Sequence, residues 1–291
     1  MAYNPNAIFV SPSSLSDFEK CPQLYYYRNV YRSPRGLKIQ LINPALALGQ
    51  AVHETLDVFL KYLPSQRSKD LLLEKFEFIW ANFSGEKGGF FSENQETDYK
   101  NRAIEMLERF WQNEHFKNTQ TEKLPDFLKV DLGEDIFLTG KLDWLEKEGD
   151  LYHLVDFKTG KEEREDSLQL SIYSVLVSHL FKTRNIKASY WYLDKDTDIV
   201  PFTLLDMDEV VSYLKNKGEI IKMVRQTKSY RCQSGGESCW ACRDMVAIAQ
   251  GKGKLVSVDY VSRKQETYIL PPESFKVEEE KLPPPNDDLP F

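Results

Sequence analysis

Apolar residues recur every three or four positions through much of the first third of the chain, which is the spacing of one face of an α-helix. Leu48, Val52 and Leu56 follow this spacing and predict an amphipathic helix over residues 44–62. The same pattern predicts two more helices, over residues 68–83 and 101–116. The first third is therefore expected to be mostly helical.

The beginning of the chain carries signals for helix starts. Ser11 places a capping hydroxyl directly before Pro12, and proline suits the first turn of a helix. A helix is expected to begin there and to run toward Cys21. Pro22 is placed to open a second helix.

A different pattern begins near residue 136. Short apolar segments at 136–144 and 151–158 flank the polar sequence EKEGD, residues 146–150, which is typical of a turn and predicts a β-hairpin. Further elements are predicted as strands over 188–193 and 199–204 and helices over 167–181 and 206–225. Helices packed around a small mixed β-sheet are the expected result, which is an α/β fold.

The predicted hairpin carries charged residues where a buried strand would avoid them. Asp143 lies on the first strand, and Asp156 and Lys158 lie on the second, two positions apart and therefore on one face. Hairpin pairing can bring Asp143 alongside them. Two carboxylates next to an ammonium group suit a hard divalent cation such as Mg²⁺ or Mn²⁺, which prefers oxygen ligands. Without a cation or ion pairing, burying these charges would be costly.

Two pairs of residues four positions apart lie on the predicted helices. Gly49 and His53 share a face of the first amphipathic helix, where glycine allows close backbone approach and the imidazole can reach a metal. Gln169 and Tyr173 share a face of the helix that follows the Asp-x-Lys strand. Taken singly, each piece also fits a structural role: a surface salt bridge, a packed histidine or a packed Gln/Tyr pair. Their order along the chain is more informative.

The order is Gly-x-x-x-His, then Gly-x-x-Asp from Gly140 to Asp143, then Asp-x-Lys, then Gln-x-x-x-Tyr. This series, together with the opening SPSSLSDFEKCPQLYYY, resembles the RecB/Cas4/AddB-like branch of the PD-(D/E)XK nuclease superfamily over residues 11–244. The resemblance implies a restriction-endonuclease-like core and metal-dependent hydrolysis of DNA phosphodiester bonds.

The same resemblance implies a role for each side chain. His53, Asp143 and Asp156 would ligate Mg²⁺ or Mn²⁺. Lys158 would position or activate the attacking water and add positive charge next to the phosphate. The remaining members of the catalytic set would support the site: Gln169 and Tyr173.

Four cysteines occur in the chain: Cys21, Cys232, Cys239 and Cys242. Disulfides are not expected in a cytosolic chain, which leaves metal binding or unrelated buried thiols. The two-residue gap between Cys239 and Cys242 is common to zinc ligands and iron–sulfur ligands, so this spacing alone does not choose between them.

One cysteine before the catalytic motifs and three after them is similar to the iron–sulfur nucleases of the same branch. That resemblance implies a 4Fe–4S cluster that joins the N-terminal and C-terminal segments, so that loss of a ligand would harm the fold more than the chemistry. In those relatives the close pair usually comes first, whereas here the longer gap, from 232 to 239, comes first. Zinc remains the alternative, and a colourless purified protein would indicate it.

Composition sets the class of protein. With 291 residues, 41% of them hydrophobic, the chain can bury one sizeable core. No apolar run suits a bilayer span, and MAYNPNAIFV lacks the order of a secretory signal, so a cytoplasmic protein without membrane contact is expected. No Gly-rich phosphate loop ending in Lys-Ser or Lys-Thr occurs, so a partner helicase would be a separate chain.

The formal net charge of −7 is unevenly spread. Residues 272–291 hold six acids against two lysines and so account for −4 of it. Residues 20–38 hold five basic residues, four tyrosines and no acid. Such a mixture can line a DNA strand, while the alternative is tyrosines packed on the core with solvated arginines around them.

The C-terminal segment 271–291 is expected to be disordered, because its prolines and charges cannot bury enough apolar area. Its last six residues, NDDLPF from Asn286 to Phe291, look like the acidic tip of bacterial single-stranded-DNA-binding proteins, which implies docking on a repair protein. The alternative is a solubilising tail or one that shields the DNA channel. The remaining segments are expected to be an N-terminal segment with the first cluster cysteine (1–43), a mostly helical part (44–135), the nuclease core (136–228) and a Cys-rich cluster segment with a C-terminal extension (229–270).

These features together predict a metal-dependent DNA exonuclease or endonuclease that acts on single strands or ends, in repair, recombination or CRISPR-related processing. The alternative is a non-catalytic DNA-binding or scaffold protein with a four-cysteine metal staple that acts through its tail. The intact acidic and lysine positions favour the nuclease, since a retired site has no physical reason to keep buried charge.

Overall fold

The computed structural model describes residues 7–125, 128–160, 168–195 and 198–271, and the expected disordered tail and its NDDLPF tip fall outside them. The helices of the described chain are α1 (Pro12–Lys20), α2 (Pro22–Tyr25), the π-helix η1 (Tyr26–Val30), α3 (Pro44–Phe59), the 3₁₀ turn η2 (Pro64–Gln66), α4 (Lys69–Trp80), the 3₁₀ turn η3 (Gly85–Gly88), α5 (Glu93–Gln112), α6 (Glu114–Asn118), α7 (Gln169–Phe181), α8 (Met207–Thr227) and α9 (Arg243–Ala249). The strands are β1 (Ile8–Val10), β2 (Lys38–Leu41), β3 (Leu128–Gly133), β4 (Ile136–Gly140), β5 (Trp144–Glu148), β6 (Leu151–Lys158), β7 (Ile186–Tyr192), β8 (Val200–Phe202), β9 (Lys254–Asp259) and β10 (Gln265–Ile269).

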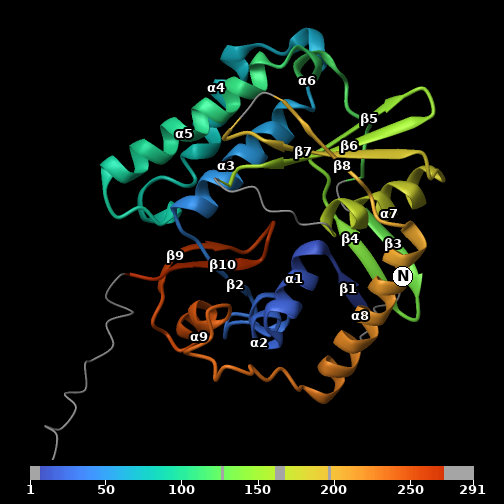
Figure 1. The fold of residues 1–291 in the computed structure, drawn as a ribbon. Helices are drawn as coiled ribbons and strands as arrows, with labels where there is room; N and C mark the ends of the chain where they lie inside the picture. The colour runs from blue at the N-terminus through green and yellow to red at the C-terminus, as the bar shows by residue number, and fades with distance from the viewer. Residues whose placement is uncertain (1–6, 126–127, 161–167, 196–197, 272–291) are drawn as a thin grey trace, which may run out of the picture.

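The central sheet has the strand order β5-β6-β7-β8 and is mixed. The β5–β6 and β7–β8 pairs are antiparallel, whereas β6 and β7 are parallel and are joined through α7 (Figure 1). In the β6–β7 register Asp156 lies opposite Tyr190 and Lys158 lies opposite Tyr192. The strand with the Asp-x-Lys motif is therefore an interior strand of this sheet.

Alternation along β6 separates two layers of core, because successive side chains of a strand point to opposite faces. Val155 and Phe157 pack in the core that α3, α4 and α5 share with the sheet. Leu154 packs on the opposite face, in the core that includes α7, α8 and the three-stranded sheet β1-β4-β3. Figure 1 shows these two layers on either side of β6 and β7. Asp156 and Lys158 thus fall on the face toward α7.

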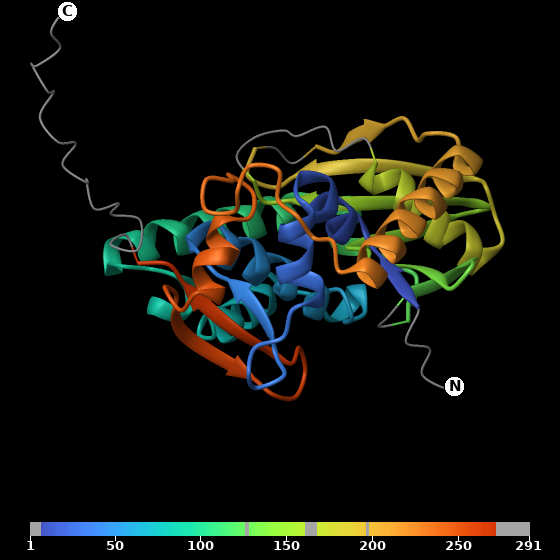
Figure 2. The ribbon, with the colours of Figure 1, turned by 90° about the horizontal axis from the view of Figure 1, so that it is seen from below.

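A third sheet joins the two ends of the described chain. Strand β2 runs parallel to β10, with Lys38 opposite Gln265 and Leu41 opposite Tyr268, and β10 pairs antiparallel with β9. Figure 2 shows β2, in blue, alongside the red strands of the C-terminal hairpin. Ile39 and Val246 bury their side chains in a small core that also contains cysteines of the predicted cluster. The N-terminal and C-terminal segments are therefore held by backbone pairing as well as by the cysteines.

The prediction of one hairpin strand over 136–144 was wrong. Residues 136–140 form β4 in one sheet, and β5 begins at Trp144 in another, so Asp143 lies in the bend just before β5. The predicted turn over 146–150 is also too long: Glu146 pairs with His153 within the β5–β6 ladder, and only Gly149 and Asp150 turn the chain. Gly149 has a φ of 60°, which glycine adopts easily in a tight hairpin turn.

The predicted α/β class with small mixed sheets flanked by helices is confirmed, while several helix bounds differ. The helix predicted over 101–116 begins at Glu93, where Ser92 caps it by accepting a hydrogen bond from the backbone of Gln95. It ends at Gln112, and Asn113 caps the separate helix α6. Segments predicted without strands, at 8–10, 38–41, 128–133 and 254–269, contribute strands to the two three-stranded sheets.

No helix in the described part of the chain combines the length and the apolar character needed to cross a membrane.

Candidate metal-dependent active site

The motif residues converge at the end of β6, from segments far apart in the sequence. His53, on α3, places its Nδ1 atom 2.9 Å from Oδ1 of Asp143. The other oxygen of Asp143, Oδ2, accepts a hydrogen bond of 2.9 Å from the backbone N–H of Phe157. Asp143 is thus fixed to β6 although it does not belong to a strand.

A closed set of contacts links the second carboxylate to the lysine. Lys158 Nζ lies 2.9 Å from Oδ2 of Asp156 and donates a hydrogen bond of 2.6 Å to Oε1 of Gln169. The amide nitrogen of Gln169 donates to Oδ1 of Asp156 at 2.9 Å and lies 3.4 Å from the hydroxyl of Tyr173. Gln169 is the first residue of α7, the helix that follows β6. Its side-chain amide therefore contacts the strand that precedes it in the sequence. The structure brings together all the predicted site residues of this set.

Two motif glycines explain how the elements come so close. A Cβ atom on Gly49 would lie 3.0 Å from Oγ1 of Thr159, directly after the Asp-x-Lys motif. A Cβ atom on Gly140 would lie 2.8 Å from Leu176 and 3.0 Å from the ring of Tyr173. Glycine therefore lets α3 approach the end of β6 and lets β4 approach α7.

The two carboxylates differ in their electrostatic surroundings. Burial, and after it the charge of Asp143, raises the pKa of Asp156 to about 6, against the opposing effect of Lys158. Burial also disfavours the ionised form of Asp143, but the charge of His53 and hydrogen bonds from His53 and the Phe157 N–H outweigh it and lower its pKa. Asp143 is therefore ionised at neutral pH. The pKa of Asp156, at about 6, lies much closer to neutral pH.

His53 completes this pattern. Burial alone would lower the pKa of His53, yet the nearby Asp143 carboxylate outweighs it and the pKa is raised. The side chain of His53 is 34% exposed and that of Asp143 is 18% exposed, so this pair stands at the edge of the site. Perturbed groups gathered in this way are characteristic of functional sites.

The donor set suits a hard divalent cation, because it offers carboxylate oxygens and one imidazole. In the described part of the chain the four cysteines are the one group of three or more Cys, His, Asp or Glu residues whose donor atoms all lie within 4.8 Å of one another. The donor atoms of His53, Asp143 and Asp156 are not all within that distance of one another. Both oxygens of Asp156 are engaged, one with Lys158 and the other with Gln169. His53, Asp143 and Asp156 are the residues that would hold such a cation, and Asp156 would have to give up its contact with Lys158 to serve as a ligand.

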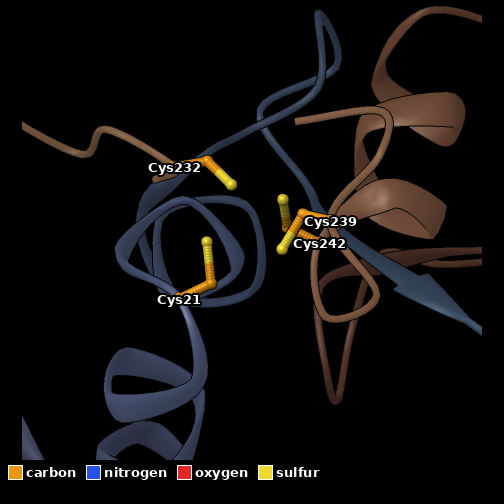
Figure 3. A group of neighbouring side chains, drawn as sticks. All are labelled: Cys21, Cys232, Cys239 and Cys242. Atoms are coloured by element: carbon orange, nitrogen blue, oxygen red, sulfur yellow. The ribbon is translucent and has the colours of Figure 1, made fainter. Parts of the chain in front are cut away.

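The four cysteines meet as the sequence predicts. Cys21 follows α1, Cys239 and Cys242 lie at the start of α9, and Cys232 approaches from the chain between α8 and α9 (Figure 3). Cys232 is half-buried and the other three are buried. Burial opposes ionisation of Cys232, but backbone N–H groups of the following loop outweigh it and lower its pKa to about 7. Burial and the neighbouring thiols raise the pKa of Cys242.

Two residues near the site were not found from the sequence. The ring of Tyr190 lies 5.0 Å from Lys158 Nζ, on the neighbouring strand β7. Arg102, on α5, donates to the backbone oxygen of Thr159 at 3.2 Å and forms a salt bridge with Asp194. Parallel pairing with β6 could have pointed to Tyr190, but nothing in the spacing around Arg102 marks it.

Carboxylates and a lysine at the end of a central strand of an α/β core are the groups that metal-dependent hydrolysis of a phosphodiester needs. The sequence matches the model of the PD-(D/E)XK nuclease superfamily over residues 10–247, and the chain belongs to that superfamily. A solved structure described as that of a presumed exonuclease from Eubacterium rectale is similar with a TM-score of 0.50 and 14% sequence identity, covering 84% of this chain and 93% of that one. This likeness supports the fold alone. No curated protein matches the sequence.

Proposed function

We propose that this protein is a metal-dependent nuclease that hydrolyses phosphodiester bonds of single-stranded DNA or of DNA ends. The superfamily makes it a nuclease, and the observation that carries the finer proposal is the contact set around Lys158. Lys158, Asp156 and Gln169 are mutually within hydrogen-bonding distance. Asp143 is fixed to the backbone of Phe157, which lies between Asp156 and Lys158. Repair, recombination or CRISPR-related processing are the settings that a RecB/Cas4/AddB-like enzyme would serve.

His53, Asp143 and Asp156 would hold Mg²⁺ or Mn²⁺. Such a cation supplies a nucleophilic water near neutral pH and neutralises charge on the scissile phosphate. Lys158, displaced from Asp156, would place its ammonium group against the phosphate or the attacking water, with Gln169 keeping it in position. The Tyr190 ring faces the ammonium at 5.0 Å and would retain it next to the strand.

We also propose that the four thiols bind a 4Fe–4S cluster. The arrangement of one cysteine upstream and three downstream of the nuclease core supports it, as does the joining of distant segments at that point. A single Zn²⁺ held by thiolates at ~2.3 Å would place the sulfurs roughly 3.8 Å apart, which fits the observed spacing within 4.8 Å. The larger four-iron core would need the four sulfurs to move farther apart than they are here. Visible absorbance and iron or zinc content of the purified protein would decide between them.

Cleavage of end-labelled DNA tests the nuclease proposal. Single-stranded DNA labelled at its 5′ or 3′ end is incubated with the wild type and with Lys158→Ala, in Mg²⁺, in Mn²⁺ and without divalent cation. The matched control is Lys147→Ala, an exposed lysine on the neighbouring strand β5. Cleavage that requires the cation, persists in the control and is lost in Lys158→Ala supports the proposal. Equal cleavage by both variants would refute the assigned chemistry, and DNA binding without cleavage by the wild type would favour the scaffold alternative.

A further inference from the structure

A cavity separate from the candidate active site lies between η1, the C-terminal end of α8 and the loop that carries Cys232. It has a volume of about 840 Å³, within the range of ~300–1,000 Å³ typical of ligand pockets. None of the candidate catalytic residues lines it. Figure 1 shows the chain leaving α8 and passing α2 on its way to α9. Residues of this passage, from Lys228 to Gly236, line one side of the cavity.

The cavity is positively charged. Arg225, Lys228 and Arg231 line it, and no aspartate or glutamate does. Within the residues that the structure describes, no carboxylate forms a salt bridge with any of the three. Arg32 is a further cation near this group. Burial, and after it the charge of Arg225, lowers the pKa of Arg32. Among the residues that the structure describes, no acid in the lining of the cavity balances this positive charge.

Aromatic rings form the other part of the lining. The rings of Tyr26 and Tyr230 lie with centroids 4.8 Å apart and planes inclined by 37°. Tyr27 also lines the cavity, and all three tyrosines are half-buried. Arg225 has a structural use as well, since its charge next to Tyr25 and Tyr230 opposes the rise that burial causes in the pKa of both hydroxyls. Lys228 and Arg231 are exposed. Within the described residues, neither side chain has a hydrogen bond or salt bridge that would give it a structural role.

We propose that this cavity binds single-stranded DNA, with phosphates on Lys228 and Arg231 and a base against the Tyr26–Tyr230 pair. Cationic walls that follow a backbone, combined with aromatic faces, are the features by which proteins hold unpaired strands. A duplex keeps its bases stacked inside and cannot use the tyrosine faces in this way. The choice of DNA rests on the proposed nuclease function, and the cavity would hold a part of the strand away from the reacting phosphate.

Binding is measured by fluorescence anisotropy with the full chain, carrying its bound metal cluster, and a labelled single strand of about 20 nucleotides. No divalent cation is added, so binding is observed whether or not the protein cuts DNA. The test variant is Lys228→Ala/Arg231→Ala. The matched control is Arg184→Ala/Lys187→Ala, which removes two exposed cations far from the cavity, one of them paired with Asp208 in the first turn of α8.

The expected result for the test variant is weaker binding by roughly tenfold or more and a salt dependence, as the slope of log K against log salt, reduced by about 1.4. Tyr230→Ala should weaken binding by roughly tenfold, while Tyr230→Phe, which keeps the ring, should bind as the wild type does. Metal content is measured for each variant. Where Arg231→Ala alters it, through the adjacent Cys232, Lys228→Ala alone supplies the comparison with Lys187→Ala.

Equal affinity and equal salt slope in the test and control variants would overturn the proposal. Binding of a duplex as tight as that of the single strand, with no loss in Tyr230→Ala, would also overturn it. Failure of the nuclease proposal would look different: a protein that binds single strands through these residues but cleaves none retains this cavity as a binding site without the catalysis.

Discussion

Asp143 accepts a hydrogen bond from the backbone N–H of Phe157 at 2.9 Å, so a residue outside the strands is fixed to β6, the strand that carries Lys158, the candidate catalytic lysine. Phe157 stands between Asp156 and Lys158, and its own side chain is buried on the opposite face. Packing of Phe157 therefore helps to fix the backbone position on which both candidate carboxylate ligands, Asp143 and Asp156, depend. The backbone of Phe157 thus contacts the candidate site, while its side chain belongs to the hydrophobic core.

Gln169→Ala is expected to lower the turnover rate by roughly 10–100-fold while leaving KM for DNA nearly unchanged. Gln169 contacts Lys158 and Asp156 and is a positioning residue in the proposed chemistry. Single-turnover cleavage rates across pH provide the measurement. Gln169→Glu would put a third carboxylate next to Asp156 and should move the acid limb of the profile to higher pH. Gln226→Ala, an exposed glutamine on α8, is the control, and a matching loss of rate there would contradict this role.

Metal binding at the candidate site is expected to weaken as the pH falls through about 6. The pKa of Asp156 is raised to about 6, so this carboxyl is protonated below that pH and available as a ligand above it. His53 adds to the trend, because its pKa is raised and an imidazole must be neutral to coordinate a metal. Calorimetric titration with Mn²⁺ between about pH 5 and about pH 8 provides the measurement.

At the acid end of this pH range, each bound cation should displace up to about two protons. This number is the slope of the logarithm of the Mn²⁺ affinity against pH. His53→Gln should remove one of them and keep the step near pH 6, whereas Asp156→Asn should bind weakly at every pH tested. An affinity independent of pH in the wild type would show that neither group takes part in binding the cation.

Local sequence patterns identified side chains that the structure brings together, because the motif residues lie on elements whose periodicity is strong. The Asp-x-Lys alternation and the four-residue spacings of His53 with Gly49 and of Tyr173 with Gln169 are properties of a strand and a helix taken alone. The structure adds which atoms meet, such as the Gln169 amide between Lys158 and Asp156.

What the sequence did not show depends on pairing between distant segments. Strand β1 is three residues long and pairs with β4, and β2 pairs with β10 across more than two hundred positions. Short strands carry little periodicity, and parallel partners leave no local turn signal. The bend at Asp143 was missed for a related reason, because an apolar run through 136–144 looks like one strand when two sheets are not distinguished.

A peptide of residues 280–291 is expected to bind a repair protein that recognises acidic tips of single-stranded-DNA-binding proteins. Phe291 would enter an apolar pocket while Asp287 and Asp288 steer the approach to a basic surface. Fluorescence anisotropy of the labelled peptide provides the measurement, and the same peptide without Leu289–Phe291 is the control. Absence of binding by the complete peptide would leave the segment a solubilising or channel-shielding tail.

Cys21→Ser is expected to destabilise the protein more than it impairs chemistry in the molecules that remain folded. Cys21 is the one candidate ligand from the N-terminal segment, so its loss would open the loop that a bound metal would close between positions 21 and 232. The pairing of β2 with β10 still holds those segments together, and so the fold should loosen without being lost. Thermal unfolding should shift down by several degrees, and cluster absorbance or bound metal should fall in parallel.

Trp240→Ala provides the matched comparison for that experiment. Trp240 lies between two candidate ligands, Cys239 and Cys242, but its side chain is 72% exposed, so removing it should leave metal content and unfolding temperature close to those of the wild type. Specific activity is then normalised to the folded fraction in each variant. A Cys21→Ser protein that unfolds at the wild-type temperature with undiminished metal content would show that this cysteine is not a ligand. Loss of activity at full stability would instead place the cluster in the chemistry, against the staple role argued from its position between the two ends of the chain.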